Sequence, residues 1–131
     1  MTPKDREPVK RVEKIIKEYD KNLSVSVLKT SARTAQEAAI SLNCDVGAIV
    51  KSLLFKTDSK YALFLIAGDK KASLKKIKKN LKFSDVSMAS ADEVKSVTGY
   101  SIGGVSPVGH LKKINIYIDI SLERFDFLFA A

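Results

Sequence analysis

The sequence predicts an α+β domain in which helices flank one mixed β-sheet. Its 131 residues are enough for a single domain with its own hydrophobic core, and 45% of them are hydrophobic, as in globular proteins. Segments with helical and with strand periodicity follow one another irregularly, and two apolar strand segments are joined by a short polar turn. Regular βαβ winding would require a helix between successive strands, so we expect an α+β fold.

The N-terminal third is predicted to contain two helices and one strand. Apolar side chains recur at helical spacing over residues 7–20, which predicts a helix with one apolar face. Alternating apolar side chains over residues 24–29 predict a strand. Thr34 lies three residues before Glu37, the capping-box pattern, so we expect a short helix that ends near Asn43.

A β-hairpin is predicted next, from two strongly apolar segments over residues 48–56 and 61–67. Lys51 interrupts the first segment and, by strand alternation, shares a face with Ile49 and Leu53. An ammonium at that position suits a cleft that holds an oxygen or a phosphate. The alternative is a lysine that extends to the surface or protects an edge strand from aggregation.

Further helices and strands are predicted in the second half of the chain. Six lysines crowd into residues 70–80, whose apolar residues recur at helical spacing. The expected elements are a basic helix over 70–80, a strand over 83–88, a helix that starts at the capping box Ser90-Ala-Asp-Glu93 and ends before Gly99, and a strand over 114–119.

Residues 99–110 are predicted to form a stiff loop. Gly103, Gly104 and Gly109 surround Pro107, and glycine serves where φ is positive or where a ligand approaches the backbone closely. Exposed backbone N–H groups of such a loop can hold an anion, a carbonyl oxygen or a sugar hydroxyl. A structural turn between two strands is the alternative. Tyr100 suits the core as well as base stacking, and His110 suits an ordinary loop position.

The net charge of +8, from 23 Lys and Arg against 15 Asp and Glu, suggests a polyanionic partner. Nucleic acid comes first and an acidic membrane second, beside the alternative of a merely basic surface. The lysines of residues 70–80, with Lys112 and Lys113 beside the glycine loop, are the candidates for a sugar–phosphate backbone.

Several classes of protein are disfavoured. Cys44 is the only cysteine and His110 the only histidine, which excludes an internal disulfide and argues against a zinc site or a serine hydrolase triad. No apolar run is long enough to span a membrane, and the first residues lack the apolar core of a signal peptide. We therefore expect a cytoplasmic protein with no membrane, metal or cofactor.

Residues 25–131 carry a series of motifs in a characteristic order. They are Thr34-Ala-x-Glu-Ala-Ala39, Ile49-Val-Lys-Ser-Leu-Leu54, Gly68-Asp69, Thr98-Gly-Tyr100, Gly103-Gly-Val-Ser-Pro107 with Gly109, and Ile118-Asp119. This order and spacing resemble the YbaK/ProX-like aminoacyl-tRNA deacylase family, also called the YbaK/prolyl-tRNA synthetase-associated domain. Residues 1–24 would precede that domain as an N-terminal helix and lead-in.

The resemblance implies a barrel-like mixed sheet with a pocket between the lysine strand and the glycine loop. It also implies a trans-editing enzyme that hydrolyses the ester of a mischarged aminoacyl-tRNA, with a small amino acid on tRNA for proline or a related tRNA. The implied partners are the CCA end and acceptor stem of the tRNA, with a tRNA synthetase as a further candidate. No metal or cofactor is needed, because the ester is already labile.

The family's catalytic lysine matches Lys51, and its backbone-presenting loop matches Gly103, Gly104, Ser106 and Pro107. Loop N–H groups would stabilise charge on oxygen, where one donor contributes about 3 kcal/mol. Lys51 would hold the terminal adenosine or its phosphate, or polarise the ester. Candidate binding residues, from the motifs and the lysine-rich segment, are Thr34, Gly68, Asp69, Lys70, Lys71, Lys75, Tyr100, Val105, Gly109 and His110.

Two departures from the family pattern stand out. Val108 replaces a larger residue, which would widen the pocket, and family members continue beyond the position of Ala131 with another strand and a helix. A non-catalytic module that binds tRNA is therefore the alternative function, and a basic domain with another small ligand is the third. The oligomeric state and the amino acid removed stay open.

Overall fold

The structure is a computed structural model that describes residues 6–28 and 32–131. Its elements in chain order are α1 (Glu7–Tyr19), α2 (Ala35–Leu42), the 3₁₀ helix η2 (Val46–Ala48), β1 (Ile49–Thr57), β2 (Lys60–Ala67), α3 (Leu74–Asn80), β3 (Val86–Met88), α4 (Ala91–Thr98), β4 (Asn115–Ile118), the 3₁₀ helix η3 (Ile120–Arg124) and β5 (Phe129–Ala130).

The hairpin of β1 and β2 forms the centre of a mixed sheet with the order β3-β1-β2-β4, and β5 also pairs with β1. Strands β2 and β3 run antiparallel to β1, whereas β5 runs parallel to β1 and β4 parallel to β2. The prediction of an α+β fold with a mixed sheet is confirmed. These pairings leave the sheet open rather than closed into a barrel.

One edge of β1 is only partly covered. Strand β3 pairs with residues 55–57 of β1, and β5 pairs with residues 49–50 at the other end. Within the described residues, no strand pairs with residues 51–53 along that edge. This gap between two partner strands positions the candidate site.

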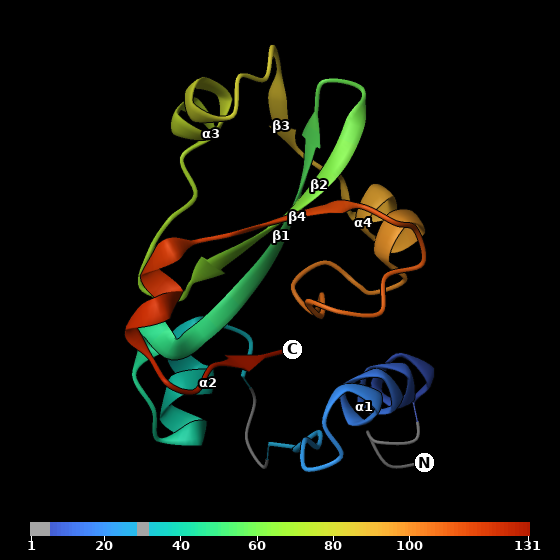
Figure 1. Cartoon of the computed structure of the whole chain (residues 1–131), viewed down its shortest axis with the longest axis vertical. Coiled ribbons are helices and arrows are strands. Elements are labelled where there is room, and N and C mark those ends of the chain that lie inside the picture. The colour runs from blue at the N-terminus through green and yellow to red at the C-terminus, as the bar shows by residue number, and fades with distance from the viewer. Residues whose placement is uncertain (1–5, 29–31) are drawn as a thin grey trace.

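The two faces of the hairpin pack against different helices (Figure 1). On one face Leu63 and Leu65 of β2 pack in a buried cluster with Val94 and Val97 of α4. On the other face, buried aromatic and aliphatic side chains of the hairpin pack against Ile77 of α3. The faces differ because side chains alternate along each strand. Hence each face has its own core and its own cavity.

Most local predictions are confirmed, and the helix caps show why. Ser90 and Glu93 form the reciprocal capping box at α4, and Gly99 ends that helix with a φ of 81°. The second capping box is incomplete. Thr34 Oγ1 accepts the Glu37 N–H at 3.1 Å, but the Glu37 carboxylate accepts the N–H of Arg33 instead of that of Thr34.

Three predictions about elements are corrected. The strand expected over residues 24–29 is absent from residues 24–28, and Lys29 lies outside the described residues. There the Val25 N–H donates to the Glu13 carboxylate, and no strand lies alongside in the described part of the chain. The basic helix starts at Leu74 rather than at 70, because Ser73 caps it, and the strand over 83–88 shortens to Val86–Met88.

The C-terminal part contains elements that the sequence did not predict, the short helix η3 and the strand β5. The glycine loop connects a helix to a strand, α4 to β4, rather than two strands. None of the helices that the structure describes is both long and apolar enough to cross a membrane.

Candidate functional site

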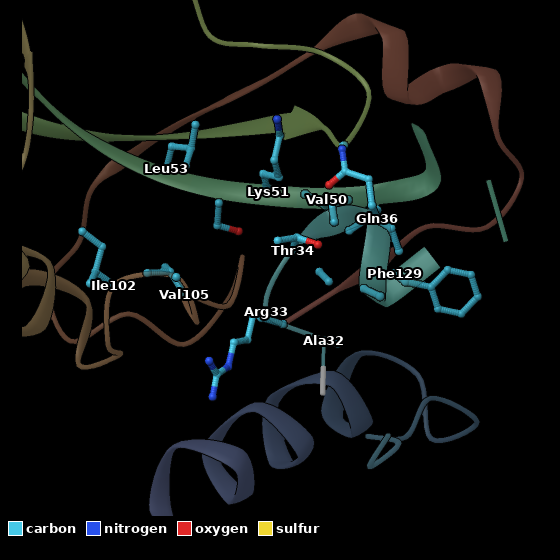
Figure 2. A pocket seen from close by; sticks show the side chains of 18 of the residues that line it. Ala32, Arg33, Thr34, Gln36, Val50, Lys51, Leu53, Ile102, Val105 and Phe129 are labelled. Atoms are coloured by element: carbon cyan, nitrogen blue, oxygen red, sulfur yellow. The ribbon is translucent and has the colours of Figure 1, made fainter. Parts of the chain in front are cut away.

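A cavity of about 510 Å³ opens beside the partly covered edge of β1. Strand β1, the segment around the start of α2, the glycine loop and the C-terminal strand β5 form its wall (Figure 2). The cavity thus lies between the lysine strand and the glycine loop. It brings together five of the residues singled out in the sequence: Thr34, Lys51, Gly68, Gly103 and Val105.

Lys51 is half-buried at the strand edge, and its side chain projects to one side of β1. Its Nζ donates to the backbone carbonyl of Lys70, in the connection between β2 and α3. Figure 2 shows the Lys51 side chain extending away from Ile102 and Val105. The ammonium therefore sits at the rim of the cavity, on the far side of β1 from the glycine loop.

The glycine loop contributes backbone to the cavity. Gly103 has a φ of 85°, and a Cβ there would meet no atom within 4 Å, so glycine is required for the backbone conformation rather than for space. The Gly104 N–H closes a turn onto the Ser101 carbonyl at 2.9 Å. The N–H groups of Gly103 and Val105 donate to no acceptor among the described residues. Both belong to residues that line the cavity.

The other residues singled out in this loop hold it together from behind. Ser106 is 1% exposed, and its Oγ accepts the Val108 N–H. The Ser106 carbonyl lies 2.7 Å from His110 Nε2, and the buried Tyr100 donates its hydroxyl to the Val108 carbonyl at 2.8 Å. Tyr100, Ser106 and His110 therefore fix the loop from inside and do not line the cavity.

Three further loop residues also lie outside the cavity lining. Gly109 has a φ of 77°, and a Cβ there would lie 2.7 Å from the Tyr100 hydroxyl, so close packing excludes any side chain. Gly104 and Pro107, expected to be catalytic from the resemblance, also lie outside the cavity lining. The loop reaches the cavity through Ile102, Gly103 and Val105 alone among its described residues.

Helix α1 supports the back of this loop. The Arg11 guanidinium lies over the Tyr100 ring, 4.7 Å from its centroid, and Glu7 accepts a hydrogen bond from Arg11 at 2.8 Å. A Cβ at Gly99 would come within 2.7 Å of Arg11 Nη2, so helix and loop are in close contact. The first helix and the glycine loop therefore form one packed unit (Figure 1).

The corner after β2 is fixed by a glycine and an ion pair. A Cβ at Gly68 would lie 2.3 Å from the Val46 carbonyl oxygen, so only glycine fits. Both oxygens of Asp69 accept from the Arg124 guanidinium, at 2.8 and 2.9 Å, and these hydrogen bonds lower the pKa of Asp69. Asp69 is thus engaged by protein and lies outside the cavity lining.

The lysine-rich segment does not contribute to this cavity. Lys70 and Lys71 line a second cleft on the other face of the hairpin, and Lys75 lines neither cavity. No group of three or more metal-ligating side chains comes together in residues 6–28 and 32–131.

Ser52 and Phe129 are among the contributors to the cavity that sequence reasoning missed. Ser52 follows Lys51 in the same motif, and its Oγ is buried without a hydrogen-bond partner in the described structure. Side chains alternate along β1, so Ser52 lies on the face opposite Lys51, and this position could have been predicted from the sequence. Phe129 reaches the wall through β5, a pairing that local sequence did not indicate.

Several known proteins are similar to this chain in sequence and in fold. The family model for the aminoacyl-tRNA editing domain matches residues 29–131. The protein YwhH of Bacillus subtilis (strain 168), described as uncharacterized, is 33% identical over 115 residues, which are 87% of this chain and 73% of that protein.

A proline–tRNA ligase of Macrococcus caseolyticus (strain JCSC5402) is 35% identical over 107 residues, which are 82% of this chain but 19% of the ligase. The chain therefore corresponds to a small part of that enzyme. A crystal structure described as a candidate trans-editing enzyme for prolyl tRNA synthetase superposes with a TM-score of 0.84 at 34% identity, covering 95% of this chain and 77% of the other. With its fold, motifs and relatives in agreement, the chain belongs to the aminoacyl-tRNA editing domain family.

Proposed function

We propose that this chain hydrolyses the ester bond of a mischarged aminoacyl-tRNA that carries a small amino acid on tRNA for proline or a related tRNA. The observation that carries the proposal is the cavity between β1 and the glycine loop, in which unpaired backbone donors border apolar side chains. Its volume of about 510 Å³ lies within the ordinary range for small-molecule sites.

The chemistry requires stabilisation of charge on the ester oxygen and exclusion of the wrong amino acid. The N–H groups of Gly103 and Val105 are the candidate donors to the developing oxyanion, held in place by the packed interior of the loop. Apolar walls limit the size of the amino-acid side chain that fits. The attacking group is water, so the products are the free amino acid and a tRNA whose terminal ribose hydroxyl is restored.

Lys51 is proposed to hold the 3′-terminal nucleotide at the cavity rim. Its ammonium would exchange the Lys70 carbonyl for a phosphate or ribose oxygen of the tRNA, a stronger partner for a cation. The unstacked, single-stranded CCA end can enter a cleft of this size, whereas a duplex cannot. We expect the reaction to occur in the cytoplasm, with tRNA supplied free or by a synthetase.

The test is release of radiolabelled amino acid from a panel of correctly charged and mischarged tRNAs. We expect cleavage of one small mischarged species and loss of about 100-fold or more in kcat/KM for Lys51→Ala, given what one aligned charged contact contributes at a transition state. Lys60→Ala is the control, since Lys60 is exposed at the start of β2 and lies outside both cavities.

Gly103→Ala probes the loop in the same assay and is expected to lower kcat more than it raises KM. Unchanged turnover in Lys51→Ala would remove that residue from the mechanism. Binding of tRNA without cleavage of any member of the panel would replace the hydrolase with a non-catalytic tRNA-binding module.

A further inference from the structure

The second cleft, of about 500 Å³, lies on the face of the hairpin that carries Phe64 and Ile66. Its other walls come from the connection between β2 and α3, from α3 itself and from the segment of β4 and η3. The hydrolysis proposed above takes place beside the other face and uses none of the side chains that line this cleft. Lys51, whose ammonium projects towards this face, lines the first cavity and not this cleft.

The floor of this cleft is aromatic. Phe64 and Tyr117 occupy opposite positions on the parallel strands β2 and β4, and their rings stack with centroids 5.0 Å apart at 16°. Phe83, outside the lining, meets the Tyr117 ring edge-on, with the ring centroids 6.4 Å apart. Ile66 and Ile77 extend the apolar surface. A flat ligand of one or two rings would find an apolar wall there.

The rim of the cleft is cationic. Lys70, Lys71 and Lys76 line it, and Asp119 is the one carboxylate among its lining residues. That carboxylate accepts the N–H groups of Ala67 and Ser121, at 3.2 and 2.9 Å, and forms no ion pair with these lysines among the described residues.

A polar atom also lacks its partner at this site. The Oγ of Ser121 is buried, and no described residue hydrogen-bonds to it, although a buried hydroxyl ordinarily finds a partner. Because Ser121 lines the cleft, a ligand with a hydroxyl or phosphate oxygen would supply that hydrogen bond.

We propose that the second cleft binds a nucleotide, with the base against the apolar floor and the phosphate among Lys70, Lys71 and Lys76. A planar ring joined to an anion matches this combination of surfaces, and an AMP-sized ligand fits the volume. The nucleotide comes either free or as one unit of an RNA strand. The site does not depend on ester hydrolysis at the first cavity.

Binding is tested by calorimetry on the full chain, with AMP, adenosine, inorganic phosphate, hexaglutamate and a single-stranded RNA ending in CCA as probes. The matched variants are Lys76→Ala and Lys75→Ala, neighbours on α3 that change the net charge equally, although only Lys76 lines the cleft. We expect AMP to bind with a Kd of ~1 mM. Lys76→Ala should raise this Kd about tenfold, whereas Lys75→Ala should raise it less than about twofold.

Ser121→Ala and Tyr117→Leu complete the set of variants. Both are expected to lower the affinity for AMP more than the affinity for inorganic phosphate. If RNA displaces AMP and its affinity depends on Lys76 in the same way, the nucleotide that the cleft binds is part of an RNA strand. If AMP binds and RNA does not displace it, the cleft binds a free nucleotide. Equal losses in the two lysine variants, no AMP binding, or hexaglutamate binding as tightly as AMP would overturn the proposal. The deacylation assay is read separately, so failure of one site does not decide the other.

Discussion

The two cavities of this chain lie beside the same hairpin but differ in how they can recognise a ligand. The first, between β1 and the glycine loop, offers backbone donors and apolar walls, with Arg33 and Lys51 as the cations among its described lining residues. The second has an aromatic floor and three lysines at its rim. Recognition by shape and directed hydrogen bonds suits the first, and attraction of phosphate suits the second.

One hydrogen bond joins the two regions. Lys51 lines the first cavity, and its ammonium donates to the carbonyl of Lys70, which lines the second. Strand alternation places this side chain on the face of the second cleft. The two proposed sites therefore meet at this hydrogen bond.

The largest expected effect concerns the loop of the first cavity. Gly109→Val should lower the free energy of unfolding by about 3 kcal/mol, because it adds left-handed backbone strain to a clash with the Tyr100 hydroxyl. Gly103→Ala is the matched control, with strain of about 1 kcal/mol and open space around its Cβ. Urea unfolding measures both, and equal losses would mean that the loop is not packed from behind.

A smaller effect is expected where α1 meets the loop. Arg11→Ala should cost about 1 kcal/mol, since it removes the cation–π contact with Tyr100 and the packing of the side-chain stem. It should also lower deacylation several-fold while AMP binding at the second cleft stays unchanged. Lys10→Ala, an exposed neighbour on the same helix, is the control. A parallel loss of AMP affinity would contradict the independence of the two cavities.

The salt dependence of RNA binding should also distinguish the two cavities. If phosphate contacts lie in the second cleft, the slope of log affinity for RNA against log salt should flatten by about 1 in Lys71→Ala. Gly103→Ala should leave this slope unchanged while it slows turnover. Titrations between low and moderate salt measure the slopes, and a slope insensitive to Lys71 would place the phosphates elsewhere.

The smallest effect is in acid stability. The hydrogen bond from Tyr61, followed by those from Ser90, lowers the pKa of Glu93 from 4.5 to about 2. A depressed folded-state pKa stabilises the fold above the unfolded value, so this contribution is lost as pH falls from 4.5 towards 2. Glu93→Gln should flatten Tm against pH in that window, while Glu18→Gln, exposed near the end of α1, should not. A profile as steep as that of the unmodified chain would contradict this account.

Much of the fold was predictable because its signals are local. Helical spacing predicted α1, the capping box of Ser90 and Glu93 predicted α4, and the polar turn between two apolar segments predicted the hairpin. The strand expected over 24–29 failed because alternation also occurs in an extended segment without a partner strand. The motifs likewise indicated a pocket between the lysine strand and the glycine loop. The cavity there is lined by Thr34, Lys51, Gly68, Gly103 and Val105.

By itself the sequence determined the helices and most of their ends, the hairpin, the glycines needed for positive φ and the family, because these depend on neighbours along the chain and on motif spacing. Only the tertiary structure decided that Tyr100 and Ser106 would brace the loop from inside, that Asp69 would be held by Arg124, and that β5 would wall the cavity. The second cleft also depends on packing, since α3 and η3 meet β2 across long stretches of sequence. Side-chain neighbours of that kind follow from how a sheet pairs and which face each helix covers, and no local pattern encodes them.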